Sequence, residues 1–215
     1  MKEEQLTGKT QQRRERLRQA LIEAAERRIA QTGYRSLTAR DMAAEAGCAV
    51  GAIYNIFADM DALAAAVNSR TAERLEAAVT GALAAEAGGD PKRQLVQLGR
   101  TYLAFVIDNP LLWSAIFELG ARAGPDFAAR REAENARLIG HVVRPLRLLL
   151  PAETEERLAL VARALFAAVH GIVSLGQQRR FLGVPPSEVA AQITFIVEAF
   201  CDGVAAHRDI APHKA

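Results

Sequence analysis

The sequence contains little cysteine, few aromatic residues and no strong excess of either charge. Its two cysteines, Cys48 and Cys201, are isolated and match neither a disulfide framework nor a zinc-ligand spacing. No run of about 18 uncharged apolar residues occurs, and the first residues lack the apolar segment of a secretion signal. We therefore expect a cytoplasmic protein without a membrane span, a metal site or another cofactor.

Composition favours a helical fold. Of the 215 residues, 50% are hydrophobic and 24% are charged, which permits a substantial core. Alanine is abundant, and no segment alternates apolar and polar residues between hairpin turns. We predict an all-α protein of about nine helices. A small three-helix head with an N-terminal arm occupies residues 1–60, and a larger helical bundle occupies 61–215.

Apolar spacing and capping residues divide the chain into helices. Apolar residues recur at four-residue steps from Leu17 to Ile29, which predicts a helix over about 12–31. Asp90-Pro91 and Asn109-Pro110 each combine a capping residue with a proline suited to the first helical turn. Further helices are predicted near 38–46, 50–56, 59–86, 91–108, 111–119, 126–150, 153–180 and 187–206, with breaks at 120–125 and 183–186 and a polar tail after His207.

Residues 33–63 have the layout of a helix-turn-helix, in which a second helix enters the major groove of DNA while the first braces it. Thr38 and Asp41 resemble a capping box at the start of the first helix. Gly47 supplies a tight turn between the two helices. The small residues Ala49, Gly51 and Ala52 leave the start of the second helix able to approach the bases.

Three side chains of this segment are suited to DNA contacts. The Tyr54 hydroxyl can reach a phosphate, and Asn55 can donate to a phosphate or pair with an adenine edge. Arg40 is long enough for bidentate contact with guanine. The alternatives are a surface-packed aromatic ring for Tyr54 and an ordinary helix-surface cation for Arg40.

The charge is distributed unevenly. Residues 1–40 contain ten Lys and Arg against five Glu, whereas residues 41–215 contain seventeen against twenty acidic residues. A basic N-terminal segment ahead of a slightly acidic body suits contact with phosphates. The same pattern is also compatible with a solvated, charged helix face.

The spaced block that runs from Gly33-Tyr34 through Thr38-Ala39-Arg40-Asp41-Met42-Ala43 and Gly47 to Tyr54 and Phe57 resembles the DNA-binding domain of the TetR family of transcriptional regulators. The resemblance covers about residues 12–65. Residues 168–175, Ala-Val-His-Gly-Ile-Val-Ser-Leu, are also similar to a His-Gly segment of one group of C-terminal domains in this family.

The resemblance implies a homodimeric repressor whose two heads occupy successive major grooves, about 34–36 Å apart or a little more. The expected DNA-binding residues are Thr38, Arg40, Ala49, Val50, Gly51, Ala52, Tyr54 and Asn55.

The sequence also departs from the family pattern. Ala49 and Ala52 stand where a hydroxyl residue is common, Ile56 where a His often occurs, and Met60 where a Lys usually binds phosphate. We expect weaker non-specific affinity and a flatter salt dependence as a result. Our hypothesis is that a basic stretch, Arg13, Arg14, Arg16 and Arg18, compensates by following the DNA backbone.

An unidentified small-molecule effector is expected to bind among the helices after residue 64 and to change the spacing of the heads. Its candidate lining is Tyr102, Phe105, Trp113, Phe117, Phe166 and His170. The low charge of this set favours an apolar or aromatic compound. The alternative is that these aromatic residues form ordinary core and that His170 satisfies a buried hydrogen bond.

The helices predicted at 153–180 and 187–206 each carry a broad apolar face. Pairing them across a two-fold axis would form a four-helix bundle, and the small residues between Ala164 and Gly171 permit close packing. The alternative is that the core of the same chain uses these faces.

Two other classes of function compete with DNA binding. A helical enzyme is disfavoured, because the sequence contains no nucleophile elbow, phosphate loop or HExxH motif. A helical adaptor for a protein partner is the second alternative. The sequence therefore predicts a ligand-responsive DNA-binding transcriptional regulator, a homodimeric repressor that a small molecule releases from a palindromic operator.

Overall fold

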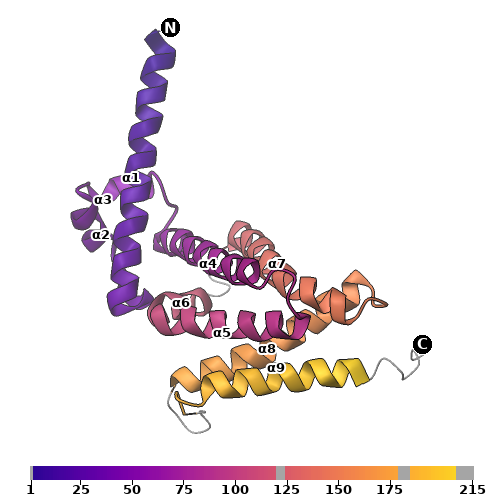
Figure 1. Cartoon of the computed structure of the whole chain (residues 1–215). Coiled ribbons are helices and arrows are strands. Elements are labelled where there is room, and N and C mark those ends of the chain that lie inside the picture. The colour runs from indigo at the N-terminus through magenta and orange to yellow at the C-terminus, as the bar shows by residue number, and fades with distance from the viewer. Residues whose placement is uncertain (1, 120–123, 179–184, 207–215) are drawn as a thin grey trace. The chain divides into compact units, whose positions relative to one another are not determined.

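The computed structural model describes residues 2–119, 124–178 and 185–206. All the regular secondary structure of these residues is helical, which confirms the predicted all-α fold (Figure 1). The elements are α1 (Lys2–Thr32), the 3-10 helix η1 (Tyr34–Ser36), α2 (Ala39–Ala46), α3 (Val50–Tyr54), α4 (Met60–Ala85), α5 (Pro91–Asp108), α6 (Pro110–Glu118), α7 (Gly124–Leu149), α8 (Glu155–Gln178) and α9 (Val189–Ala206).

Most helix boundaries follow the capping residues in the sequence. The Asp59 carboxylate accepts a hydrogen bond from the Ala62 N–H over 2.7 Å at the start of α4. Asp90 accepts one from the Lys92 N–H over 3.4 Å at the start of α5. Helix α1 differs from expectation, since it begins at Lys2 instead of near residue 12. The predicted breaks at 120–125 and 183–186 lie partly outside the described residues, and the predicted tail lies wholly outside them.

The contacts between segments of the backbone divide the chain into two compact units. Unit 1 contains the residues up to Glu73 together with 109–132, and unit 2 contains Arg74–Asp108 and the residues from Ala133 onward. Helix α4 therefore contributes residues to both units. The domain boundary predicted between residues 60 and 61 stays a prediction.

The core of unit 1 joins the N-terminal helices to α6. Leu21 of α1, Met42 of α2, Ile53 of α3 and Leu63 of α4 are fully buried in one apolar cluster. Leu112 and Ala115 of α6 belong to the same cluster. Asn68 is also buried, and its amide nitrogen donates to the Ala115 carbonyl over 3.1 Å. This hydrogen bond links α4 to α6 inside unit 1.

In unit 2, α9 packs against α5 and α8 (Figure 1). Ile193 of α9 is fully buried against Gly99 of α5, a position at which a Cβ atom would lie only 2.7 Å from the Ile193 Cγ2. An ion pair of 2.6 Å between Lys92 and Asp202 joins the same two helices at the surface. The close approach of α5 and α9 thus depends on a residue without a side chain.

Candidate nucleic-acid interface and a cavity in unit 2

Helices α2 and α3 are joined by a tight turn at Gly47. Its φ of +66° is left-handed, a conformation that glycine adopts without a steric penalty. The Gly47 N–H donates to the Ala44 carbonyl over 3.3 Å, and the Cys48 N–H donates to the Ala43 carbonyl over 2.9 Å. These bonds satisfy the last carbonyls of α2 and start α3 in a new direction.

The start of α2 is fixed by its N-cap and by α1. The Thr38 hydroxyl accepts a hydrogen bond from the Asp41 N–H over 3.2 Å, as the predicted capping box requires. Arg28 of α1 lies 3.8 Å from the Asp41 carboxylate and also pairs with Glu45. Because Met42 is fully buried beneath these contacts, α2 is held firmly on α1.

Helix α3 has one buried face and one exposed face. Ile53 is 0% exposed and Phe57, just after the helix, is 6% exposed, whereas Val50 is 42% exposed and Tyr54 is 51% exposed. Of the eight predicted DNA-binding residues, Ala52 is partly buried; the exposed ones are Thr38, Arg40, Ala49, Val50, Gly51, Tyr54 and Asn55. The helix therefore presents small side chains and a tyrosine to solvent.

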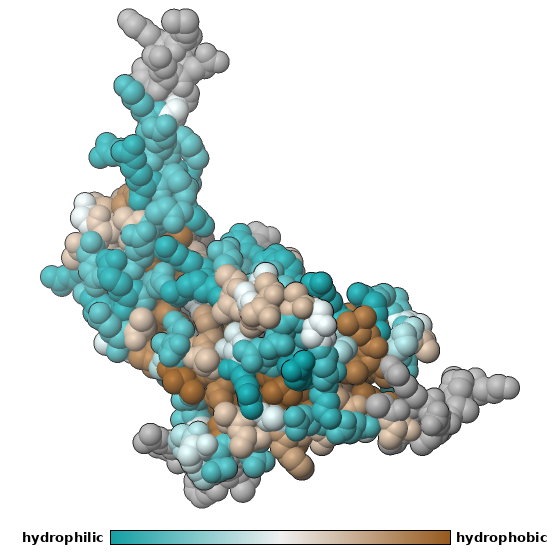
Figure 2. All heavy atoms as spheres, in the orientation of Figure 1, coloured by the Kyte–Doolittle hydropathy of each residue, from teal (hydrophilic) through white to brown (hydrophobic). Residues whose placement is uncertain are grey.

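Two arginines of the basic stretch in α1 contact the end of the helix-turn-helix segment. An Arg14 guanidinium nitrogen donates to the Asn55 carbonyl over 3.1 Å. The Arg18 guanidinium lies over the Phe57 ring, 5.6 Å from its centroid. Arg13 and Arg16 are exposed on the same helix, and the coloured part of its visible face is mostly hydrophilic in Figure 2.

The structure brings together three of the six side chains predicted to line an effector site. The Tyr102 hydroxyl and the His170 Nδ1 are 2.8 Å apart, and the Phe166 ring stacks on His170 with a centroid distance of 5.5 Å. Burial lowers the pKa of His170 below its ordinary value of 6.5. Phe105 is buried on α5 in the same unit. The remaining two, Trp113 and Phe117, contact each other on α6 in unit 1.

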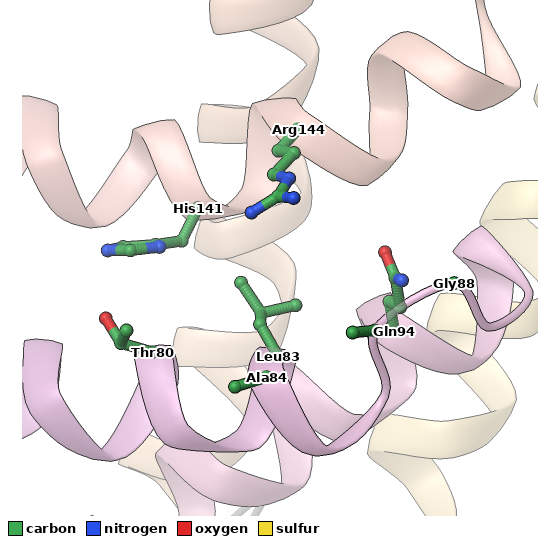
Figure 3. A pocket seen from close by; sticks show the side chains of 8 residues that line it. Thr80, Leu83, Ala84, Gly88, Gln94, His141 and Arg144 are labelled. Atoms are coloured by element: carbon green, nitrogen blue, oxygen red, sulfur yellow. The ribbon is translucent and has the colours of Figure 1, made fainter.

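Unit 2 contains a cavity of about 280 Å³ that is open to solvent and bordered by α4, α7 and the start of α5 (Figure 3). Its lining residues are Thr80, Leu83, Ala84, Ala87, Gly88, Gln94, His141 and Arg144. This set shares no member with the six predicted residues. Aromatic side chains at helical spacing do not indicate this cavity, because its apolar walls are leucine and alanine.

Two family models match the chain. One, described as bacterial regulatory proteins of the tetR family, matches residues 21–67, and the other, a tetracyclin repressor-like C-terminal domain, matches residues 95–200. The chain belongs to the TetR family of transcriptional regulators. Proteins of the TetR family are DNA-binding regulators, and the first match includes all of α2 and α3. No curated protein sequence matches the chain.

Solved structures share the TetR fold with this chain. A protein of unknown function from Rhodococcus sp. RHA1 is 24% identical, with a TM-score of 0.71 over 88% of this chain and 95% of that one. A TetR-family regulator from Streptomyces coelicolor is 22% identical, with a TM-score of 0.66 over 91% and 84%. One from Bordetella parapertussis is 18% identical, with a TM-score of 0.61 over 86% and 94%. At these identities the likeness concerns the fold alone.

Proposed function

We propose that this TetR-family protein is a homodimeric repressor that binds a palindromic DNA operator and is released from it by a small-molecule effector. The observation that carries the DNA-binding part is the two-faced structure of α3. Ile53 of α3 and Phe57, just after the helix, are buried, and the opposite face of α3 is exposed. A helix held in this way can enter a major groove without losing its own core contacts.

The exposed residues divide into two kinds of proposed contact. Gly51 has no other side chain within 4 Å of the place where a Cβ would stand, so the helix backbone can approach base edges there. Tyr54 and Asn55, at the C-terminal end of α3, are suited to the phosphate backbone. Arg40, exposed in the first turn of α2, is suited to a guanine edge.

An exposed apolar face on α8 and α9 supports the dimer. Leu160 of α8 is 55% exposed and Phe195 of α9 is 63% exposed. Residues Glu155–Gln177 are long and apolar enough to cross a membrane by length and composition, yet only 28% of their most apolar window is buried. Leu158 and Leu165 of α8 already pack inside unit 2. We propose that a second copy of the chain buries the exposed face, so that α8 and α9 of both copies form a four-helix bundle.

Helix α4 offers a route by which an effector acts on the DNA-binding head. Leu63 and Val67 of α4 are fully buried in the apolar cluster that also holds α2 and α3. Thr80 and Leu83 of the same helix line the cavity in unit 2. An effector releases DNA only if it prefers the arrangement of α4 that does not fit the operator.

Selection of bound fragments from random DNA tests this function. We expect purified protein to enrich an inverted repeat whose half-sites are about one helical turn apart. Tyr54→Ala combined with Arg40→Ala should abolish the enrichment without loss of helicity, because both side chains are exposed. Arg93→Ala, an exposed arginine of unit 2, is the matched control and should leave enrichment unchanged. Absence of any enriched motif would overturn the proposal, and a single half-site would overturn the dimer.

A further inference from the structure

The cavity in unit 2 has apolar walls on one side and polar side chains on the other. Leu83, Ala84 and Ala87 of α4 supply the apolar wall. His141 and Arg144 extend toward it from α7, as Figure 3 shows. A ligand that fits both sides must combine an apolar body with a polar group, and the charge of that group is set by the α7 side.

Arg144 differs from the neighbouring arginines of α7. Arg137 lies 3.1 Å from the Glu76 carboxylate, and Arg147 lies 2.7 Å from the Glu155 carboxylate. No carboxylate of the described residues forms an ion pair with Arg144, whose guanidinium in Figure 3 is directed toward Leu83 across the cavity. A solvent-exposed positive charge therefore borders the cavity, and the described part of the chain provides no counter-charge for it.

The carboxylate that faces His141 does not supply that counter-charge. Glu76 accepts from Arg137 through Oε2 and faces the His141 Nε2 through Oε1, at 3.7 Å. Both oxygens of this carboxylate are thus directed at other α7 side chains. An anionic ligand group beside Arg144 would be favoured electrostatically, and a cationic one would be repelled.

The remaining polar groups are neutral. The Gln94 amide nitrogen donates to the Glu86 carbonyl over 3.0 Å, which fixes the side chain at the end of α4. Gln94 and Thr80 both line the cavity. At about 280 Å³ the space lies just below the range of about 300–1,000 Å³ for ligand sites. It suits a compact molecule.

We propose that the effector is a small carboxylic acid whose carboxylate binds the Arg144 guanidinium and whose apolar body packs on Leu83, Ala84 and Ala87. A guanidinium presents paired N–H donors that match the two oxygens of a carboxylate. The proposal rests on the proposed function, because it names the chemical class of the effector in that mechanism. It keeps the predicted apolar character of the effector and adds one negative charge.

Isothermal titration calorimetry on the full chain tests the ligand class. The probes are octanoate and benzoate, each compared with its neutral amide, octanamide or benzamide. We expect at least one acid to bind at least about tenfold more tightly than its amide. Arg144→Gln should weaken the acid by about tenfold or more and leave the amide unchanged. Arg147→Gln, on the same helix but outside the lining, is the matched control and should bind like the unmodified protein.

A second variant tests the location independently of charge. Leu83→Trp places a large ring in the cavity and should remove binding of both the acid and its amide. Equal affinity for acid and amide, no binding of either acid, or unchanged acid binding by Arg144→Gln would each overturn the proposal.

Operator binding, followed by fluorescence anisotropy on the selected DNA, separates this proposal from the proposed function. If an acid binds through Arg144 but the DNA stays bound, the carboxylate site is supported and the proposed release of DNA by the effector is contradicted. If DNA binds specifically and neither acid binds, DNA recognition stands and the carboxylic-acid proposal fails.

Discussion

The Arg14 guanidinium donates to the backbone carbonyl of Asn55 over 3.1 Å, across 41 positions of sequence. Asn55 is the C-cap of α3, so this hydrogen bond joins α1 to the end of the helix proposed to enter the major groove. Arg18 covers Phe57 in the same region. Two of the four arginines in the basic stretch thus have a structural role in the head, and Arg13 and Arg16 are the better candidates for phosphate contact.

The first prediction concerns the salt dependence of operator binding. Each phosphate contact contributes about 0.9 to the slope of log K against log salt. If both Arg13 and Arg16 contact phosphate, the double variant Arg13→Ala, Arg16→Ala should reduce the slope by about 2. Fluorescence anisotropy between about 50 and 200 mM salt measures it.

Two comparisons complete that experiment. Arg93→Ala, in unit 2, should leave the slope unchanged. Arg14→Ala should lower affinity and thermal stability together, because it removes the bond to Asn55. An unaltered slope in the double variant would show that the basic stretch does not compensate for the missing phosphate contacts.

The helix-turn-helix was predictable because its signals are local. Thr38 caps a backbone N–H three residues later, and the Gly47 turn bonds to carbonyls three and five residues from their donors. Asp59 is a third example, since its carboxylate accepts from Ala62. In each case one short segment contains both the donor and the acceptor, so residue type and spacing define the geometry.

Contacts between distant segments were not predictable in the same way. The inclusion of α6 in unit 1 depends on the fit of Leu112 and Ala115 into a cluster formed mainly by residues before Glu73. The cavity combines Leu83 of α4 with Arg144 of α7, 61 positions later. No periodicity specifies such a pair. The sequence signal that was available, a stripe of aromatic residues, reflects burial in general and not a cavity.

The second prediction concerns pH. Burial lowers the pKa of His170 below 6.5, so the folded protein binds fewer protons at this residue than the unfolded chain does. The neutral His170 ring therefore makes its full contribution to the stability of the fold above pH 6.5, and this contribution is lost as the pH falls below that value. We expect the drop in Tm between about pH 7.5 and 5.5 to be smaller in His170→Gln, whose amide can donate to or accept from the Tyr102 hydroxyl.

Phe166→Leu provides the control for that measurement. It disturbs the same aromatic cluster without removing the titrating ring, so Tm should fall while the difference between the two pH values stays like that of the unmodified protein. All samples need the same protein concentration, because dimer formation itself shifts Tm. An identical pH difference in His170→Gln would show that His170 does not contribute to acid sensitivity.

The third prediction concerns the packing of α5 on α9. In Gly99→Ala the new Cβ would stand 2.7 Å from the Cγ2 of the fully buried Ile193 and 3.9 Å from Val169. Inserting a methyl group into a packed core costs about 1–3 kcal/mol, whereas replacing a helical glycine by alanine gains about 1 kcal/mol. Ile193 is β-branched and fully buried, so we expect the crowding to outweigh the gain and to cause a net loss of stability.

Gly140→Ala separates the two contributions. Gly140 lies inside α7 with no atom within 4 Å of its added Cβ, so this variant gains helix propensity without crowding. We expect Gly140→Ala to raise Tm and Gly99→Ala to lower it, at equal protein concentration. Equal increases in both variants would mean that α5 and α9 can move apart freely. The close approach at Gly99 would then contribute nothing to the rigidity of unit 2.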